Sequence, residues 1–124
     1  MPKPGPGKRL TLIVGENDRW QHHRLSDEIL RRVRDAGLAG ATVERGIEGY
    51  GRAGRLHTSR ILDLSQDLPL AIVIVDSADR VTAFLAELSE LIGEGTAVLD
   101  DVEIVGSGPP EAAGDADGAT RPGE

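Results

Sequence analysis

The stretch Leu68-Pro-Leu-Ala-Ile-Val-Ile-Val75 decides how this chain of 124 residues folds. It is a continuous apolar run with several β-branched side chains, and it ends at Asp76. A strand with one wet face alternates apolar and polar residues, whereas a run without alternation is typical of a strand buried on both faces. We therefore predict a central strand here, and we expect protein to cover each of its faces.

A helix and a last strand are predicted after this central strand. Ser77 is suited to cap the helix, and Gly93 can end it. Apolar residues recur between these two positions at helical spacing, at Val81, Phe84, Leu85, Leu88 and Ile92. The stretch Val98–Val105 then predicts the last strand, with Val102 and Ile104 as its inward positions.

The N-terminal half predicts a strand, a helix and a second strand in the same way. Leu10–Val14 is apolar and β-branched, which is typical of a strand. The stretch Ala41–Ile47 alternates in polarity and predicts a strand with one wet side. Between them, a helix that stops at Gly37 is indicated by apolar residues three and four positions apart, at Leu25, Ile29, Val33 and Ala36.

The predicted elements follow one another as β-α-β-β-α-β, the order of a ferredoxin-like sandwich. We predict an α+β fold in which one antiparallel four-stranded sheet carries both helices on one face. This arrangement leaves the second sheet face to solvent, although the stretch 68–75 is apolar throughout. Because a large apolar face is rarely left in water, we predict that further copies of the chain cover it in a homo-oligomer.

The predicted domain spans residues 9–106, and the two ends of the chain lack side chains that could form a core. Residues 1–8 are mostly Pro, Gly and Lys, and residues 107–124 form an acidic segment of Gly, Pro and Ala. Such segments cannot bury enough surface to offset the entropy lost on ordering. We therefore expect both segments to be disordered.

The composition excludes several classes of function. The chain has no cysteine, which excludes disulfides, thiol catalysis and cysteine-based zinc sites. Its net charge of −7 argues against nucleic acid or an anionic membrane as the main partner. Neither a signal peptide nor an apolar run of membrane-spanning length is recognisable, so we expect a cytoplasmic protein that does not insert into a membrane.

The loop 48–60 is rich in glycine and arginine, and Gly49-Tyr-Gly-Arg-Ala-Gly54 spells G-x-G-x-x-G after a strand. A dinucleotide-binding fold needs a long helix that begins in this motif, and residues 55–67 are too polar and too few to supply one. We interpret the loop as an anion-binding element, in which glycine backbone amides and arginine side chains contact a phosphate. The alternative is a solvated loop whose arginines pair with Glu44, Glu48 or a neighbouring subunit.

Other polar motifs are given ordinary structural interpretations. His57-Thr-Ser59 lacks the orienting acid of a catalytic triad, and we expect it to hydrogen-bond at the base of the loop. His22 and His23 are adjacent, which is the wrong spacing for a metal-binding pair on a helix or a strand, so no metal is expected. The run 31–34 is interpreted as a solvated helix face. Trp20 and Tyr50 fall in predicted loops, which favours a role at a subunit interface or in base stacking, and Tyr50 is also a candidate for modification.

Several short segments match one known family in order and spacing. They are Gly15-Glu-Asn-Asp-Arg-Trp20, Ala36-Gly-Leu-Ala-Gly-Ala-Thr42, Arg45-Gly-Ile-Glu-Gly-Tyr-Gly51, Leu56-His-Thr-Ser59, Ile61-Leu-Asp-Leu-Ser65, Asp67-Leu-Pro69, Ile74-Val-Asp76, Glu94-Gly95 and Asp101-Val102. Through them the chain resembles, from about Leu10 to Val105, a bacterial PII-like family catalogued as domain of unknown function 190.

The resemblance implies a PII-like trimer of ferredoxin-like subunits whose three sheets face inward. It also implies a regulatory protein, not an enzyme, that requires no cofactor and binds an adenine nucleotide in clefts between subunits. A loop after the second strand would contact a target such as a transporter or an enzyme, and some members are associated with fluoride channels. PII proteins carry a Lys at the end of a glycine-rich loop where this chain has Ile92-Gly-Glu-Gly-Thr96, so the ligand is free to differ from ATP.

The ligand-binding residues that we expect lie in the loop after the first strand, in the loop 48–60 with the residues before it, and in the turn after the second helix. They are Gly15, Glu16, Asp18, Arg45, Gly46, Gly49, Tyr50, Gly51, Arg52, Arg55, His57, Ser59, Arg60, Gly93, Glu94 and Gly95. The alternative function is a ligand-independent interaction module for a membrane transporter or an ion channel. An acylphosphatase-like enzyme is disfavoured, because its arginine-bearing loop is replaced here by Gly15-Glu-Asn-Asp18.

Overall fold

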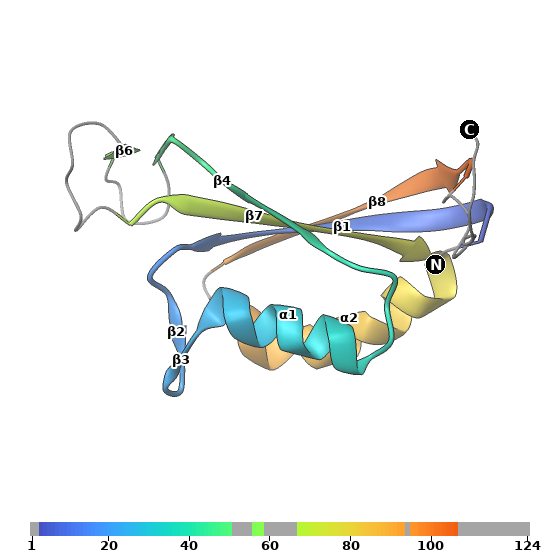
Figure 1. Cartoon of the computed structure of the whole chain (residues 1–124), viewed down its shortest axis with the longest axis horizontal. Helices are drawn as coiled ribbons and strands as arrows, with labels where there is room; N and C mark the ends of the chain where they lie inside the picture. The colour runs from blue at the N-terminus through green and yellow to red at the C-terminus, as the bar shows by residue number, and fades with distance from the viewer. Residues whose placement is uncertain (1–2, 51–55, 59–66, 94, 107–124) are drawn as a thin grey trace, which may run out of the picture.

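A four-stranded antiparallel sheet with two helices on one face forms the body of the protein (Figure 1). The computed structural model describes residues 3–50, 56–58, 67–93 and 95–106. Its elements in chain order are β1 (Gly5–Gly15), β2 (Arg19–Trp20), β3 (His23–Arg24), α1 (Leu25–Asp35), β4 (Thr42–Arg45), β5 (Glu48–Tyr50), β6 (Leu56–Thr58), β7 (Pro69–Ser77), α2 (Ala78–Ile92) and β8 (Thr96–Ile104). The order of strands in the sheet is β4-β7-β1-β8. The predicted α+β ferredoxin-like sandwich is therefore confirmed.

The core lies between the sheet and the two helices, which run side by side beneath it (Figure 1). Its main members are the buried residues Leu10, Leu12, Val14, Ile29, Val33, Leu70, Ile72, Ile74, Val81, Phe84 and Leu88. Each large aliphatic side chain that is fully buried contributes about 1.5–3 kcal/mol through the hydrophobic effect. The helical spacing read from the sequence thus marks the core-facing side of both helices.

The end of α1 is set by a glycine, as predicted. Gly37 has a φ of +75°, a left-handed conformation that glycine adopts without steric cost. The amide of Gly37 donates to the carbonyl of Arg34 at 3.0 Å, and that of Leu38 donates to the carbonyl of Val33 at 3.2 Å. This pair of bonds is a Schellman motif, which satisfies carbonyl groups at the helix end and turns the chain back toward the sheet.

Strand β1 begins earlier than predicted, and the expectation of a disordered segment 1–8 is wrong for residues 5–8. Gly5 pairs with Ile104 of β8, and Gly7 pairs with Ser77 of β7. Two ordered neighbours supply backbone hydrogen bonds that do not depend on an apolar side chain. A Cβ on Gly7 would lie 2.6 Å from the Ile104 side chain, so glycine is required by close packing here.

Strand β4 is shorter than the predicted stretch 41–47, and the predicted loop 48–60 contains regular structure. β5 and β6 form a separate antiparallel pair, in which Glu48 lies opposite Thr58 and Tyr50 opposite Leu56. Residues 51–55, 59–66, 94 and 107–124 lie outside the described residues, which includes the predicted site residues Gly51, Arg52, Arg55, Ser59, Arg60 and Glu94.

Both helices lie on one face of the sheet, as predicted, and the second face of the sheet is the one that we expect further copies of the chain to cover (Figure 1). Along β7, Leu70, Ile72 and Ile74 are buried on the helix side, whereas the alternate residues are only half-buried. In the described part of the chain no layer lies on the side of these alternate residues (Figure 1). We call this surface the bare face; the half-buried or exposed apolar residues on it include Ile13, Ala71, Val73, Val75, Val98 and Val102.

Candidate functional site

Three of the predicted ligand-binding segments meet at one end of the sheet, which lies on the left of Figure 1. β1 and β4 end there, and β7 and β8 begin there, because neighbouring strands are antiparallel. The register places Gly15 opposite Pro69, and Arg45 opposite Leu70. We call this region the sheet end; it comprises residues 15–18, 45–46, 67–69, 93 and 95.

The turn after β1 is closed by carboxylates of the chain itself. The amide of Gly15 donates to the Asp18 carboxylate at 2.9 Å, and the amide of Asn17 donates to the Asp67 carboxylate at 2.8 Å. The amide of Glu16 donates to the Leu68 carbonyl at 2.8 Å. Backbone donors that a phosphate could use are therefore already satisfied in this structure.

Gly15 cannot be replaced without moving this arrangement. A Cβ at this position would lie 2.7 Å from an oxygen of Asp67 and 2.9 Å from an oxygen of Asp18. The sequence reasoning missed Asp67, although it stands directly before β7 and so has to lie at the same end of the sheet as Gly15. Its position before a strand was the signal that could have identified it.

Arg45 and Glu16 form a bidentate ion pair at the sheet end. The Arg45 Nε lies 2.8 Å from Glu16 Oε2, and Nη2 lies 3.2 Å from Oε1. The hydrogen bond from Arg45 lowers the pKa of the Glu16 carboxyl below its usual range, against a smaller opposing effect of burial. The Arg45 side chain is 54% exposed and that of Glu16 is 20% exposed, so solvent reaches the guanidinium. Both residues were predicted to bind ligand, and the structure places them in contact with each other.

Gly46 and Gly95 allow segments of the sheet end to approach closely, and Gly93 supplies the positive φ that ends α2. The Gly46 amide donates to the Pro69 carbonyl at 2.8 Å, and a Cβ on Gly46 would lie 2.8 Å from the Pro69 ring. Gly93 ends α2 with a φ of +55°. A Cβ on Gly95 would lie 3.0 Å from the carbonyl of Ile13, so this glycine lies against the end of β1.

The remaining described site residues lie on the β5–β6 pair, which follows β4. Gly49 lies opposite His57, and Tyr50 lies opposite Leu56. The pair leaves the body of the protein at the sheet end (Figure 1). The segment 48–58 therefore begins three residues after Arg45, next to the ion pair with Glu16.

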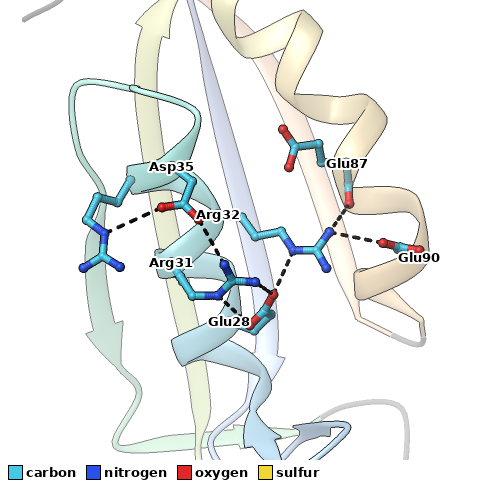
Figure 2. Close-up of polar contacts among 7 residues, drawn as sticks. Glu28, Arg31, Arg32, Asp35, Glu87 and Glu90 are labelled. Atoms are coloured by element: carbon cyan, nitrogen blue, oxygen red, sulfur yellow. Dashed lines mark hydrogen bonds and ion pairs between the residues drawn. The ribbon is translucent and has the colours of Figure 1, made fainter.

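A cluster of charged side chains joins the two helices (Figure 2) and contacts Trp20 of the hairpin that follows the first loop. Glu28 is only 3% exposed and accepts hydrogen bonds from Arg31 and Arg32, which lower its pKa to about 2. Arg32 also bonds to Glu90 of α2 at 3.2 Å, and its guanidinium lies 5.0 Å from the centroid of the Trp20 ring. We call Trp20, Glu28, Arg32 and Glu90 the helix cluster.

The helix cluster corrects one sequence-based interpretation and adds a contact that the sequence did not predict. The run 31–34 is not a uniformly solvated face, because Arg32 is 15% exposed and joins α1 to α2. Trp20 packs against the core and beneath Arg32, which gives it an intramolecular role that the sequence did not predict. The cluster thereby links the β2–β3 hairpin, which follows residues 15–18, to the last turns of α2, which precede residues 93 and 95.

Asp76 lies at the opposite end of β7 and takes no part in the sheet end. Burial raises the pKa of its carboxyl, but the amides of Ser77 and Ala39 and the side chain of Arg80 outweigh this effect and lower the pKa overall. Ser77 occupies the N-cap position of α2 without a side-chain capping bond. Asp76 therefore ties the start of α2 to the turn after α1, which is a structural role and supports the rejection of a dinucleotide motif.

The described residues contain neither a metal-ligand cluster nor a membrane-spanning helix. No three His, Asp or Glu side chains of the described ranges are grouped so that they could hold a metal ion. His22 lies in the turn of the β2–β3 hairpin, His23 lies in its second strand, and both side chains are exposed. Neither of the described helices is long and apolar enough to cross a membrane.

The fold is similar to that of PII-like proteins of known structure. One is CPII, a nitrogen regulatory PII-like protein from Thiomonas intermedia K12 solved with ADP, AMP and bicarbonate, with a TM-score of 0.62 and 17% sequence identity. The similarity covers 82% of this chain and 91% of CPII. A second is a putative PII-like signaling protein from Thermus thermophilus, with a TM-score of 0.59, 18% identity and the same two coverages.

The chain belongs to the family DUF190, "Uncharacterized ACR, COG1993", whose model matches residues 7–104. It is 30% identical over 98 residues to a UPF0166 protein of Aquifex aeolicus (strain VF5), and the aligned region covers 79% of this chain and 92% of that protein. It is 31% identical over 98 residues to the UPF0166 protein MJ1524 of Methanocaldococcus jannaschii, which covers 78% and 90%. The family predicted from the short segments is confirmed.

Proposed function

We propose that this protein is a PII-like regulatory protein. It binds an adenine nucleotide, ADP or AMP, in clefts between the subunits of a homotrimer, and it acts on a target protein through the segment 48–60. The observation that carries the proposal is the gathering of residues 15–18, Arg45–Gly46 and Gly93 with Gly95 at one end of the sheet. This end adjoins the bare face, so a neighbouring copy can complete a cleft there.

The bare face is suited to contact further copies of the same chain. Its central residue Val73 lies between Thr11 and Thr42 across the register, and Val75 lies opposite Arg9. Its charged pair, Arg9 with Asp100, is joined by two hydrogen bonds of 3.2 and 2.6 Å and so carries no net charge. Because burying this face removes apolar surface from water, association of copies is favourable.

The nature of the ligand is supported by the neighbours and by the charge of the sheet end. CPII, which has the same fold, is solved with ADP and AMP. The stretch Ile92–Thr96 has no Lys, whereas Arg45 lies in the described part of the site. Without this lysine, the turn after α2 supplies no cation for a third phosphate, which favours AMP and ADP over ATP.

Native mass spectrometry and calorimetry test this proposal together. We expect an assembly of three chains of 13.1 kDa each, and a saturable heat of binding for ADP or AMP. A protein that is monomeric at tens of micromolar and gives no heat with either nucleotide contradicts the proposal. A trimer that binds neither nucleotide would support the proposed assembly and would exclude ADP and AMP as the ligand.

A ligand-independent interaction module for a membrane transporter or an ion channel is the second candidate. One observation favours it: Arg45 and the amides of Gly15 and Asn17 are already paired within the chain, so the site is complete without ligand. In that case, Arg52→Glu with Arg55→Glu abolishes capture of a purified target, and ADP has no effect on capture by the unmodified protein. Capture that depends on ADP excludes this candidate.

A further inference from the structure

At the sheet end, an anionic ligand would bind the Arg45 guanidinium. In this structure the Glu16 carboxylate already occupies that guanidinium. Arg45 offers a planar fork of donors, and Glu16 now fills it with two hydrogen bonds of 2.8 and 3.2 Å. A phosphate presents the same spacing of oxygen atoms as a carboxylate, so both groups compete for the same fork.

We propose that Glu16 is an internal competitor of the ligand, so that an anion binds at Arg45 only by displacing the Glu16 carboxylate. The inference rests on the proposed function, because it assumes a phosphate-bearing ligand at the sheet end. Glu16 then sets how much negative charge a ligand must bring before it binds.

The exposure of the two side chains makes such an exchange feasible. More than half of the Arg45 side chain is open to solvent, so a ligand reaches it without unfolding the site. Ion pairs in contact with water contribute little net free energy, because each partner is well hydrated when separated. The pair is therefore strong enough to hold Arg45 in the free protein and weak enough to yield to a phosphate.

The backbone on both sides of the pair does not have to move. The Glu16 amide is bonded to the Leu68 carbonyl and the Gly46 amide to the Pro69 carbonyl, each at 2.8 Å. An exchange of partners therefore requires rotation of two side chains only. Because Arg45 ends β4 three residues before β5 begins, the exchange takes place at the root of the segment 48–58.

Glu16 differs in this respect from the other acids of the sheet end. The carboxylates of Asp18 and Asp67 accept backbone amides of the turn, which are fixed by the fold. Glu16 instead accepts hydrogen bonds from the Arg45 side chain, which can rotate toward another partner. The bidentate pair with Arg45 therefore assigns the role of competitor to Glu16.

A double-mutant cycle measured with ADP tests the inference. The dissociation constant of ADP is measured by calorimetry for the full chain, Glu16→Gln, Arg45→Gln and the double variant. We expect Glu16→Gln to bind about two- to fivefold more tightly, the range set by an exposed ion pair, and Arg45→Gln to bind at least about tenfold more weakly. In the Arg45→Gln background, Glu16→Gln has no further effect, because no guanidinium remains to be released.

Asp35→Asn is the matched control. Asp35 pairs with Arg31 at 3.0 Å on the exposed side of α1, so this variant removes the same charge and a similar ion pair away from the sheet end. We expect its affinity for ADP to stay within about twofold of the unmodified protein, as for a distant exposed charge.

The outcomes separate the inference from the proposed function. If the unmodified protein binds ADP but Glu16→Gln does not bind it more tightly, only the inference fails. If Glu16→Gln raises the affinity for ADP equally in the Arg45→Gln background, the inference is also overturned. The gain would then come from removing a negative charge and not from releasing Arg45. If neither the unmodified protein nor any variant binds ADP, the proposed function fails and the inference fails with it.

A measurement on the unmodified protein avoids any effect of substitution on folding. In ¹⁵N NMR spectra the Nε–H signal of Arg45 should move when ADP is added, while that of Arg31 should stay in place. Binding of ADP without a change at Arg45 would contradict the exchange.

Discussion

The helix cluster and the sheet end both contain an arginine paired with a glutamate, but the two pairs are built differently. Glu28 is 3% exposed and its partner Arg32 15%, and Arg32 has further contacts with Glu90 and Trp20. Glu16 is 20% exposed and its partner Arg45 54%. An arginine–carboxylate pair holds elements together when it is enclosed and has several partners, and we infer that it is exchangeable when it is open to solvent.

The largest effect is expected from Arg32→Ala. The substitution removes the contacts with Trp20 and Glu90 and leaves the enclosed Glu28 carboxylate with Arg31 alone. We expect the melting temperature to fall by about 5 °C or more, as typical for loss of an enclosed polar network in a domain of this size.

Arg34→Ala is the control for this measurement. Arg34 is on the same helix, is 79% exposed and lies 3.9 Å from Asp35. We expect its melting temperature to change by less than about 2 °C, as for other exposed positions. Equal losses in the two variants would remove the distinction between enclosed and open arginines.

The next effect concerns the sheet end and is expected from Gly15→Ala. The new methyl group would lie within 3 Å of the carboxylates of Asp67 and Asp18, so at least one of them has to give up its backbone amide. We expect the free energy of unfolding to fall by about 1–3 kcal/mol, as for other overpacked sites. Chemical denaturation measures the change.

Gly40→Ala provides the comparison for Gly15→Ala. A Cβ on Gly40 meets no atom within 4 Å. We expect this variant to be as stable as the unmodified protein or more stable by up to about 1 kcal/mol, because alanine has fewer conformations in the unfolded chain. A similar loss in both variants would show that crowding at Gly15 is not the cause.

A smaller effect concerns acid stability and again depends on the helix cluster. The folded-state pKa of Glu28 is about 2, below its ordinary value of 4.5. Because the pKa is lowered by folding, the stabilisation is fully present above pH 4.5 and is lost as the pH falls toward 2. The difference in melting temperature between the unmodified protein and Glu28→Gln should therefore shrink across this interval, while a difference that is constant with pH contradicts the role of the charge.

The smallest effect on stability is expected from Glu16→Gln. Its pair with Arg45 is open to water, so we expect the free energy of unfolding to change by about 0.2–1 kcal/mol. Denaturation of Arg45→Gln should give a change in the same range. A loss of several kcal/mol in either variant would mean that the pair holds the sheet end together and is not exchangeable.

Much of the fold could be predicted from the sequence because it is encoded locally. The apolar run 68–75 marks β7, the spacing of Val81, Phe84 and Leu88 marks α2, and Gly37 marks the end of α1. Each of these signals lies within one element and reflects the repeat of a helix or a strand. The family resemblance was also readable, because its short segments keep their order along the chain.

The candidate site could be predicted only in part. The residues that gather at the sheet end were named from their position after strands, but their partners were not. Arg45 bonds to a residue 29 positions away, and the Asn17 amide bonds to one 50 positions away. Such contacts depend on the register and twist of the sheet, and no local sequence pattern specifies either of them.

By itself, the sequence determined the order of the elements, the sides that face the core and the family of the protein, because helical and strand periodicity is a property of neighbouring residues. Only the tertiary structure decided that residues 5–8 join the sheet and that Arg32 is enclosed while Arg45 is open. These features depend on which segments from distant parts of the chain come to lie side by side.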